Sequence, residues 1–409
     1  MLFAALLKSI VRTGSLRLVD GAGRTHQIGD GQAPQCTIRI GDRRLDYTLA
    51  LNPALSVGEA YMNGSLTIED GTLYDFLEVA AQNYVHLERN PWFALLNTVT
   101  RRLRQYNPAA RARRNVAHHY DLSGKLYDLF LDRDRQYSCA YFLSETDSLE
   151  TAQENKKRHI ASKLLLDSPG LKVLDIGSGW GGLGLYLAEE TGADVTGVTL
   201  STEQHKVSQD RAAETGLTGR VRFHLRDYRD EPGCYDRIVS VGMFEHVGVP
   251  HYREFFSKLK DLLAEDGVAL LHSIGRTDPP GGTNPWLQKY IFPGGYTPAL
   301  SEVMAAVQQV GLWVTDIEIL RLHYAETLRA WRHRFLANRD AVRALYDERF
   351  CRMWEFYLIG SELAFRHGGQ MVFQMQLAKR QEAVPLTRDY MTDWERAHTT
   401  AGRARLRAV

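Results

Sequence analysis

A glycine-rich turn constrains the fold of this chain more than any other feature. Residues 173 to 182 read VLDIGSGWGG, an apolar run that ends in four glycines, and the segment from Gly182 onward, GLGLYLAEE, is typical of a helix. Gly177, Gly179 and Gly182 form the pattern G-x-G-x-x-G, in which the chain turns sharply and a ligand approaches the backbone where a Cβ would intrude. The stretch predicts the strand, turn and helix of a fold that binds a dinucleotide or a nucleoside.

Strand-like and helix-like segments alternate along the chain from about residue 115 to residue 320. The predicted strands are KVLDIG, ADVTGVTL, VRFHLRD, DRIVSVG, VALLHSIG and WVTDIEIL. Alternation of this kind indicates an α/β fold with a doubly wound, mostly parallel sheet. We assign this sheet to a large domain over residues 121–395.

Two other parts of the chain have different patterns. Residues 1–105 contain short alternating segments such as TIRIG and LDYTLAL, then a helical stretch from Leu73 to Leu87, which predicts a smaller α+β domain. Residues 325–380 are helical in pattern and rich in aromatic residues, which predicts a helical cap inserted into the sheet domain. Large aromatics dominate every core, so we expect about two thirds of this set to be ordinary core and the others to wall a long apolar cavity.

Two basic segments are candidates for contact with a membrane surface. Six arginines and no acid lie between Arg101 and Arg114, which predicts a basic linker at residues 106–120. The tail, residues 396–409, is also basic and ends the run ERAHTTAGRARLRAV. Such runs either meet anionic head groups or form a solvated face, and charge pattern alone leaves both readings open.

Composition excludes several other classes of protein. A formal net charge of +1 over 409 residues gives no reason to expect a nucleic-acid partner. The four cysteines lack the spacing of a zinc site or a disulfide framework, so we expect no metal and a reduced, cytoplasmic compartment. No stretch has the roughly 18 apolar residues of a spanning helix. The first segment, MLFAALLKSIVRT, is amphipathic, and it predicts a helix either docked on its own domain or lying on a membrane.

The acidic residues around the glycine turn narrow the choice of ligand. Nicotinamide-binding folds place an acid about twenty residues past the glycines to bind the ribose, yet the second strand here ends in GVTLSTEQ. Asp175 instead stands just before the first glycine, where S-adenosylmethionine sites use an acid to orient the methionine amino group. S-Adenosylmethionine is therefore the leading candidate. Asp227, after the third strand, is placed to approach the adenine, or else is a solvated turn residue.

Eight blocks in order carry a more specific resemblance. They are HYDLSGKLYDLFLD, YSCAYF, VLDIGSGWGGL, GVTLSTEQ, MFEHVG, LLHSIG, YIFPGG and HYAETLRAW, within residues 118 to 331. Together they resemble the cyclopropane-fatty-acyl-phospholipid synthases, relatives of the mycolic acid cyclopropane synthases and members of the class I, Rossmann-like methyltransferases. The segment GEAYMNGSLTIEDGTLYDFL also resembles the longer, phospholipid-acting forms, which implies lipid recognition by the N-terminal domain.

The resemblance implies a reaction and the residues that perform it. The methyl group of S-adenosylmethionine goes to a cis double bond of an unsaturated phospholipid, and a bound bicarbonate takes the proton that is lost on ring closure. Matching the family's bicarbonate ligands position by position gives Cys139, Glu245, His272, Ile274 and Tyr324. Matching its cofactor contacts gives Tyr137, Ser138, Gly177, Gly179, Gly181, Thr199, Ser201 and Gln204. Ser178 stands where the family often has cysteine.

Three alternatives to cyclopropane formation remain, and each predicts something different. Loss of another proton after the same methyl transfer would give a methylene- or methyl-branched acyl chain. A lipid-binding protein without activity would lack part of the cofactor loop or of the bicarbonate set, and neither is missing here. A nicotinamide oxidoreductase would need the absent ribose-binding acid. We expect the enzyme to lie peripherally on the inner face of the membrane, and only the resemblance suggests a homodimer.

Overall fold

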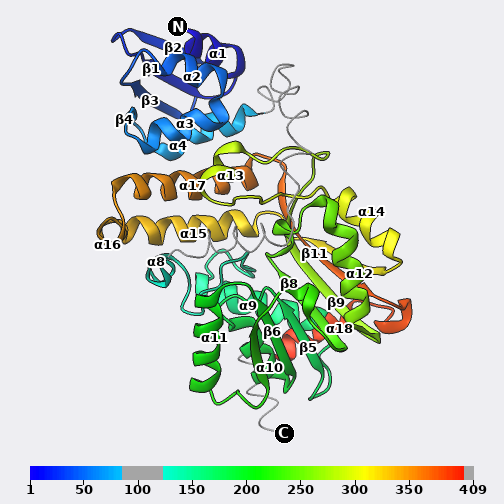
Figure 1. Ribbon diagram of the computed structural model, residues 1–409. Helices are drawn as coiled ribbons and strands as arrows, with labels where there is room; N and C mark the ends of the chain where they lie inside the picture. The colour runs from blue at the N-terminus through cyan, green and yellow to red at the C-terminus, as the bar shows by residue number, and fades with distance from the viewer. Residues whose placement is uncertain (85–122, 400–409) are drawn as a thin grey trace.

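The computed structural model describes residues 1–84 and 123–399, and it contains two sheets (Figure 1). The larger sheet has seven strands in the order β10-β11-β9-β8-β5-β6-β7. Strands β5 to β9 run parallel, whereas β11 is antiparallel to both β9 and β10, so the predicted mostly parallel sheet is confirmed. Its strands are β5 Lys172–Ile176, β6 Asp194–Thr199, β7 Val221–Leu225, β8 Tyr235–Val241, β9 Leu263–Arg276, β10 Trp313–Ile319 and β11 Gln370–Ala378.

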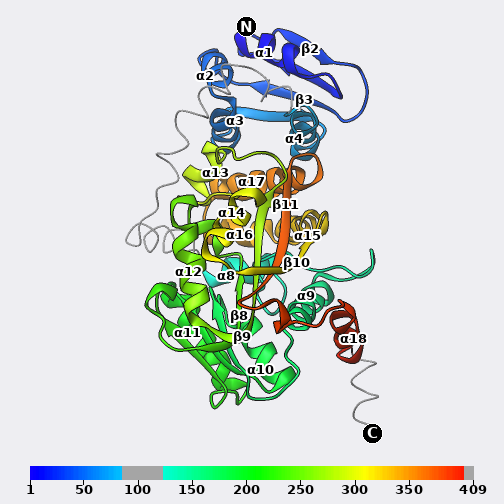
Figure 2. The ribbon, with the colours of Figure 1, turned by 90° about the vertical axis from the view of Figure 1, so that its right-hand side faces the viewer.

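Helices cover both faces of this sheet and form a separate layer beside it (Figures 1 and 2). The α-helices are α8 Gly124–Phe130, α9 Leu149–Lys163, α10 Gly182–Thr191, α11 Thr202–Glu214, α12 Tyr252–Leu262, α13 Pro285–Tyr290, α14 Leu300–Val310, α15 His323–Ala337, α16 Arg339–Leu345, α17 Glu348–Arg366 and α18 Asp389–Ala397. Short 3₁₀ turns are η1 Tyr228–Asp230, η2 Phe244–His246, η3 Val249–His251 and η4 Gln381–Ala383. No helix in residues 1–84 or 123–399 is long and apolar enough to cross a bilayer.

The N-terminal part is a small α+β unit around a four-stranded sheet of order β2-β1-β3-β4. Its elements are α1 Leu2–Ile10, β1 Ser15–Val19, β2 Thr25–Gly29, β3 Gln35–Ile40, α2 Leu45–Leu51, α3 Pro53–Met62, β4 Leu66–Asp70 and α4 Leu73–Gln82. Helix α1 buries Phe3, Ala4 and Leu7 in this unit's core, so the amphipathic first segment is docked on its own domain. The basic linker at residues 106–120 lies outside the described residues.

The strand-like pattern of LDYTLAL was misleading, because the segment forms helix α2. Its alternating apolar residues would have put Leu51 on a buried face, yet Leu51 is 64% exposed and Leu49 is the buried residue. Asp46 accepts hydrogen bonds from the backbone of Leu2 and Phe3, at 2.9 and 2.8 Å, at the start of α1. Tertiary contacts with α1 therefore decide the conformation of this short segment.

The predicted helical cap is correct for α15, α16 and α17 and wrong for its last part, residues 370–378. That part is the strand β11, which pairs with β9 on one side and β10 on the other. Its sequence, QMVFQMQLA, lacks strand alternation because residues 371–378 are buried on both faces. A central strand of this kind cannot be told from a buried helix by periodicity alone.

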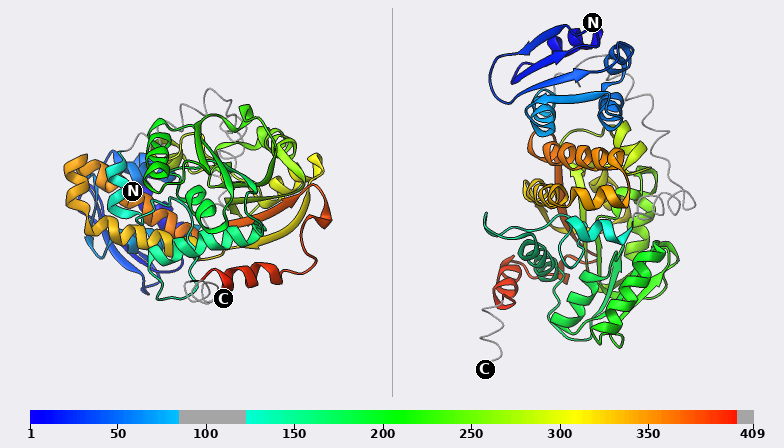
Figure 3. Two further views of the ribbon diagram at one scale, coloured as in Figure 1. Left: turned by 90° about the horizontal axis from the view of Figure 1, so that it is seen from below. Right: turned by 90° about the vertical axis from the view of Figure 1, so that its left-hand side faces the viewer.

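The helices α15 and α17 lie between the N-terminal unit and the large sheet (Figures 1 and 3). Ile359 and Leu363 of α17 belong to the hydrophobic core of the N-terminal unit. The Tyr61 hydroxyl donates to Glu355 at 3.1 Å across the same boundary. The N-terminal unit is thus packed directly on the cap, and deleting residues 1–105 would expose apolar surface of α17.

Candidate active site

A cofactor cavity opens at the carboxyl ends of β5, β6 and β8, where the strand order of the sheet reverses. This is the place where doubly wound sheets bind ligands. Eight of the predicted cofactor residues line it, namely Tyr137, Ser138, Asp175, Gly177, Gly179, Thr199, Gln204 and Asp227. The fold therefore brings these eight residues of the predicted cofactor site together.

Two glycines of the turn line the cofactor cavity, but only Gly179 of the two has open space beside it, because a Cβ on Gly177 would lie 2.9 Å from the Met243 side chain. Gly177 and Gly179 adopt positive φ, +84° and +54°, and a Cβ on Gly179 would meet nothing closer than 4.0 Å. Gly181 does not line the cavity, and a Cβ there would lie 2.8 Å from the side chains of Phe223 and Ser208. Ser201, also outside the lining, caps α11 by accepting from Gln204 N. Gly181 and Ser201 shape the site without facing it.

Asp175 is buried below the turn with one carboxylate oxygen available to a ligand. The residue is 2% exposed, and within the described residues its Oδ2 atom has no hydrogen-bond partner. Burial raises the pKa of Asp175 to about 7. An unbonded buried carboxylate is costly, and the ammonium of a methionine moiety would satisfy it. The residues present therefore fit S-adenosylmethionine.

The other predicted cofactor residues are held by neighbours inside the protein. The Thr199 hydroxyl donates to Gln204 Oε1 at 3.1 Å, and both side chains are buried. The carboxylate of Asp227 accepts two bonds from the Arg229 guanidinium, at 2.9 and 2.6 Å, and caps η1. Asp227 thus lines the cavity in a fixed orientation, and its contact with adenine stays a prediction.

Lys156 is a buried cation beside the cofactor cavity that the sequence did not reveal. Its side chain is 1% exposed, and its ammonium donates to Ser138 Oγ at 3.0 Å and to Gln136 Oε1. Burial lowers the pKa of Lys156 to about 8, and its charge lowers the pKa of Asp175. The run ENKKRHIASK has the charge of a solvated helix, so no sequence signal marked this lysine as buried.

Binding of S-adenosylhomocysteine should weaken as the pH falls below about 7, because protonation of Asp175 removes the carboxylate that accepts the ligand's ammonium. Lys156→Met removes the charge that lowers the pKa of Asp175, so this pKa should rise. Binding should then begin to weaken at a higher pH than in the wild type. Titration calorimetry across pH measures both midpoints. Lys125→Met, an exposed lysine of α8, is the matched control, and an unmoved midpoint in Lys156→Met would refute the coupling.

A second cavity, called here the inner cavity, adjoins the cofactor cavity. The two share Tyr137, Ser138, Gly242 and His246 in their linings. All five residues predicted to hold bicarbonate line the inner cavity, although they come from four separate segments: Cys139, Glu245, His272, Ile274 and Tyr324. The fold therefore assembles the complete predicted set beside the cofactor.

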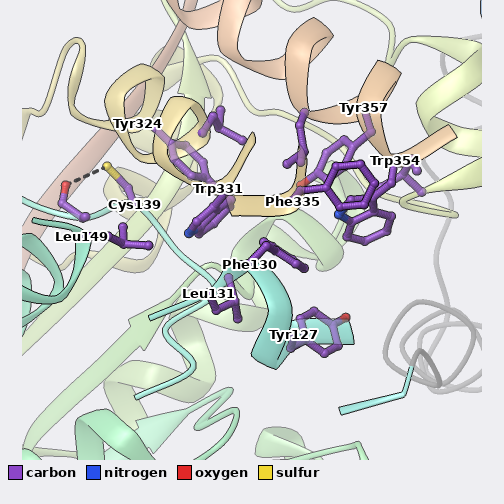
Figure 4. Close-up of a cluster of buried hydrophobic side chains, with 14 of the residues drawn as sticks. Tyr127, Phe130, Leu131, Cys139, Leu149, Tyr324, Trp331, Phe335, Trp354 and Tyr357 are labelled. Carbon is purple, nitrogen blue, oxygen red and sulfur yellow. Dashed lines mark hydrogen bonds between the residues drawn. The ribbon is translucent and has the colours of Figure 1, made fainter. Parts of the chain in front are cut away.

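The segment YSCAYF crosses between α9 and α15 and is fixed by backbone hydrogen bonds. Gln153 donates to the carbonyl of Ser138 at 2.9 Å, and Ala140 N donates to the Thr327 hydroxyl at 3.0 Å. Burial raises the pKa of the Cys139 thiol, which donates to the Ala140 carbonyl at 3.3 Å (Figure 4). Cys139 is thus a neutral, internally bonded thiol and not a nucleophile.

Glu245 presents one carboxylate oxygen to the inner cavity. It lies in η2, directly after β8, and its Oε1 accepts from the backbone N–H of Ile274 at 2.6 Å. Its buried Oε2 has no hydrogen-bond partner within the described residues. Burial raises the pKa of Glu245 to about 7, so this carboxyl can either donate or accept a proton near neutral pH.

Neighbouring polar groups fix the tautomer of His272. Lys163, which can only donate, bonds to Gln374 Oε1 at 2.7 Å, so the Gln374 amide nitrogen faces His272 Nδ1 at 3.2 Å. Burial lowers the pKa of His272 to about 3, so the ring is neutral. Its proton therefore sits on Nε2, and the ring is a hydrogen-bond donor on that side.

Aromatic rings surround the inner cavity. Tyr324 packs against Phe365, with ring centroids 4.9 Å apart, and Tyr137 stacks on Trp331 at 5.1 Å. Figure 4 shows Tyr324 and Trp331 on one side of this cluster and Trp354 and Tyr357 of α17 on the other. Of the nine aromatic residues between residues 325 and 380, Phe356 and Tyr357 line the cavity nearest the N-terminal unit and Phe365 lines the inner cavity.

A third cavity, the outer cavity, continues the inner one toward the N-terminal unit. It encloses about 470 Å³ and shares seven lining residues with the inner cavity: Thr283, Leu287, Thr297, Gly360, Ser361, Ala364 and Gln370. Helix α4 contributes apolar Leu77, Ala80 and Ala81 to its wall. The three cavities thus adjoin one another in sequence from the domain boundary to the cofactor site.

Comparisons with known proteins agree with this arrangement. A family model described as mycolic acid cyclopropane synthetase matches residues 108–375. The cyclopropane-fatty-acyl-phospholipid synthase of Escherichia coli is 36% identical over 86% of this chain and 89% of its own length. A probable fatty acid methyltransferase of Pseudomonas putida is 36% identical over 89% and 91%. The tuberculostearic acid methyltransferase UfaA1 of Mycobacterium tuberculosis is 37% identical over 89% and 88%.

A solved structure also resembles the sheet domain and cap. The mycolic acid cyclopropane synthase CmaA1 complexed with SAH and CTAB has a TM-score of 0.62 and is 34% identical, covering 66% of this chain and 99% of its own. These relatives account for the large domain, and the full-length relatives extend over the N-terminal unit as well.

Proposed function

Because the chain belongs to the mycolic acid cyclopropane synthetase family of S-adenosylmethionine-dependent methyltransferases, which act on lipid acyl chains, we propose a specific reaction for it. The enzyme transfers the methyl group of S-adenosylmethionine to the cis double bond of an unsaturated phospholipid acyl chain. Proton loss, assisted by bicarbonate, then closes a cyclopropane ring. The name of the Escherichia coli relative supports the choice of phospholipid.

One observation supports the proposal above all others. The inner cavity gathers Cys139, Glu245, His272, the Ile274 backbone and Tyr324 next to the cofactor cavity, although these residues are far apart in sequence. A cavity meant only to hold an acyl chain would have no need of a carboxyl group, since a buried polar group is costly unless it bonds to a ligand. The polar set therefore favours chemistry at the middle of an acyl chain.

An alkene is a weak nucleophile, so the rate of methyl transfer depends on how the double bond is positioned against the methyl donor and on the exclusion of water. The shared walls of the cofactor and inner cavities, Tyr137 and Gly242 among them, would bring the double bond against the sulfonium methyl group. Methyl transfer leaves a cation on the acyl chain, and the faces of Tyr137, Tyr324 and Phe365 stabilise such a charge. A dry, aromatic cavity also keeps water from trapping it.

The residues of the inner cavity fit bicarbonate. Glu245 Oε2 has no partner in the described residues, and His272 carries its proton on Nε2, so both a carboxyl and a donor are available. Lys156, buried nearby, gives the surroundings a positive charge that favours a small anion. Bicarbonate held there would supply the base for ring closure, while Glu245 holds or shares its proton.

A second product is favoured by the names of other relatives. The Pseudomonas putida relative, at 36% identity, is called a probable fatty acid methyltransferase, and the Mycobacterium tuberculosis relative, at 37%, a tuberculostearic acid methyltransferase. The same methyl transfer with loss of a different proton would give a methylene- or methyl-branched chain. The complete bicarbonate set favours the cyclopropane, because a base beside the new methyl group removes the proton that permits ring closure.

Access to lipid requires peripheral contact with a membrane surface. The outer cavity opens beside α4, so we place lipid entry at the boundary between the N-terminal unit and the cap. Membrane contact by the basic linker or by the tail stays a prediction, since residues 106–120 and 400–409 lie outside the described residues.

Lipids from cells that express the protein with a monounsaturated fatty acid supply test the proposed product. Mass cannot distinguish a cyclopropane from a methylene branch, because the two are isomers. Proton NMR separates the cyclopropane methylene from alkene protons. We expect the cyclopropane signal, and the signal of an alkene methylene (C=CH₂) in its place would establish the second product.

A further inference from the structure

One face of strand β9 connects the inner cavity to the outer cavity. His272, Ile274 and Arg276 alternate along β9 and so lie on the same face of the sheet. Opposite them on β11 stand Gln374, Val372 and Gln370. A strand rises roughly 3.3 Å per residue, so Arg276 lies about 13 Å along β9 from His272. The strand thus carries a cation at the outer cavity in line with the anion ligands of the inner cavity.

Arg276 has a charge that nothing in the described residues neutralises. Its Nε is buried without a hydrogen-bond partner, and its guanidinium makes one long contact, 3.5 Å, to the Gly282 carbonyl. Within residues 1–84 and 123–399 it forms no ion pair, and the Asp278 carboxylate, which lines the same cavity, lies against Gly369 instead. A guanidinium held in this state is a ready partner for a ligand anion.

Two walls of the outer cavity are suited to hydrocarbon. Leu77, Ala80 and Ala81 of α4 form one wall, and Phe356 and Leu363 of α17 form another. The lining also includes Asp278, whose carboxylate lies against Gly369, so the apolar walls and the Arg276 cation together match a phospholipid at its interfacial region. In such a lipid glycerol links the phosphate to two acyl chains, and a mid-chain double bond is separated from the phosphate by the glycerol and the ester-side half of one chain.

We propose that Arg276 binds the phosphodiester of the lipid whose unsaturated chain occupies the inner cavity, and that the second acyl chain lies against α4. The proposal rests on the phospholipid substrate proposed above. It gives Arg276 a positioning role, because a fixed phosphate sets how far the chain reaches and which carbons meet the cofactor. It also explains why helix α4 of the N-terminal unit borders the path.

Binding of a soluble lipid tests the site without requiring turnover. The protein loaded with S-adenosylhomocysteine is titrated calorimetrically with dihexanoylphosphatidylglycerol below its micelle concentration, and with dihexanoylglycerol, which lacks phosphate. Arg276→Gln should weaken binding of the phospholipid roughly ten- to hundred-fold and leave the diglyceride unchanged. Arg276→Lys, which keeps the charge, should recover part of the loss. Arg343→Gln, an exposed arginine of α16, should match the wild type.

Three results would overturn the proposal. Arg276→Gln and wild type could bind the phospholipid equally, or the variant could lose the diglyceride as strongly as the phospholipid, which would indicate a general packing defect. Inorganic phosphate could bind as tightly as the lipid and with the same dependence on Arg276, which would identify free phosphate as the ligand. If the binding difference is found but no methylated chain forms, the proposed reaction fails and the phosphate site stands.

Discussion

Glu245→Gln should lose turnover by a factor on the order of 10² to 10⁴ while its affinity for S-adenosylhomocysteine stays within about two-fold of wild type. The substitution keeps the size of the side chain and the oxygen that accepts from Ile274 N at 2.6 Å. It replaces the unbonded Oε2, which can take or give a proton, with an amide that can only donate. Glu245 does not line the cofactor cavity, so the loss should appear in the chemical step.

Two measurements decide this prediction. Single-turnover rates with cofactor-saturated enzyme report the chemical step, and calorimetry reports cofactor binding. Equal losses in both would assign Glu245 to cofactor binding and contradict its role at the inner cavity. Glu254→Gln, an exposed glutamate of α12, is a matched control that should behave as wild type.

Gly360→Phe should reduce turnover by on the order of a hundred-fold, because it would fill the path along which the acyl chain reaches the cofactor. Gly360 lies on α17 and lines both the inner and the outer cavity. A Cβ built on Gly360 meets no atom within 4 Å, so a large side chain can enter the cavity without disturbing the helix. Gly360→Ala should retain most activity, since one methyl group leaves the path open.

Cofactor affinity separates a blocked path from a damaged fold. Gly360 is absent from the lining of the cofactor cavity, so Gly360→Phe should bind S-adenosylhomocysteine as the wild type does. Activity like that of wild type in Gly360→Phe would show that the acyl chain enters by another route.

Much of the site could be predicted because parallel strands end at one edge of the sheet. Asp175 and Thr199 lie at the carboxyl ends of β5 and β6, and Asp227 and Glu245 follow β7 and β8, so the order of those strands brings the four residues together. Motif matching then added Cys139 and Tyr324, which pattern alone would have left as buried core. Gly177 and Gly179, which line the cavity, and Gly181, which packs behind it, look alike in sequence, so the pattern could not tell that Gly181 lies outside the lining.

Other features depend on packing that no local pattern encodes. Lys156 is buried because Ser138 and Gln136 accept its hydrogen bonds inside the protein, whereas its neighbours in sequence resemble a solvated helix. Strand β11 is defined by its partners β9 and β10. The outer cavity exists only where α4 meets α17 and the segment after β9, three parts of the chain separated by long stretches of sequence. The role that we propose for Arg276 depends on that cavity, so the residues around it in sequence do not indicate the role.

The central claim is that a base in the inner cavity closes a ring on a methylated acyl chain. Purified protein, S-adenosylmethionine and vesicles of a cis-monounsaturated phosphatidylglycerol should be incubated with bicarbonate and, in parallel, under strict exclusion of carbon dioxide. Proton NMR of the recovered lipid should show the cyclopropane methylene with bicarbonate and much less of it without. A product with alkene methylene protons, or a ring signal of equal strength in both samples, would contradict the account.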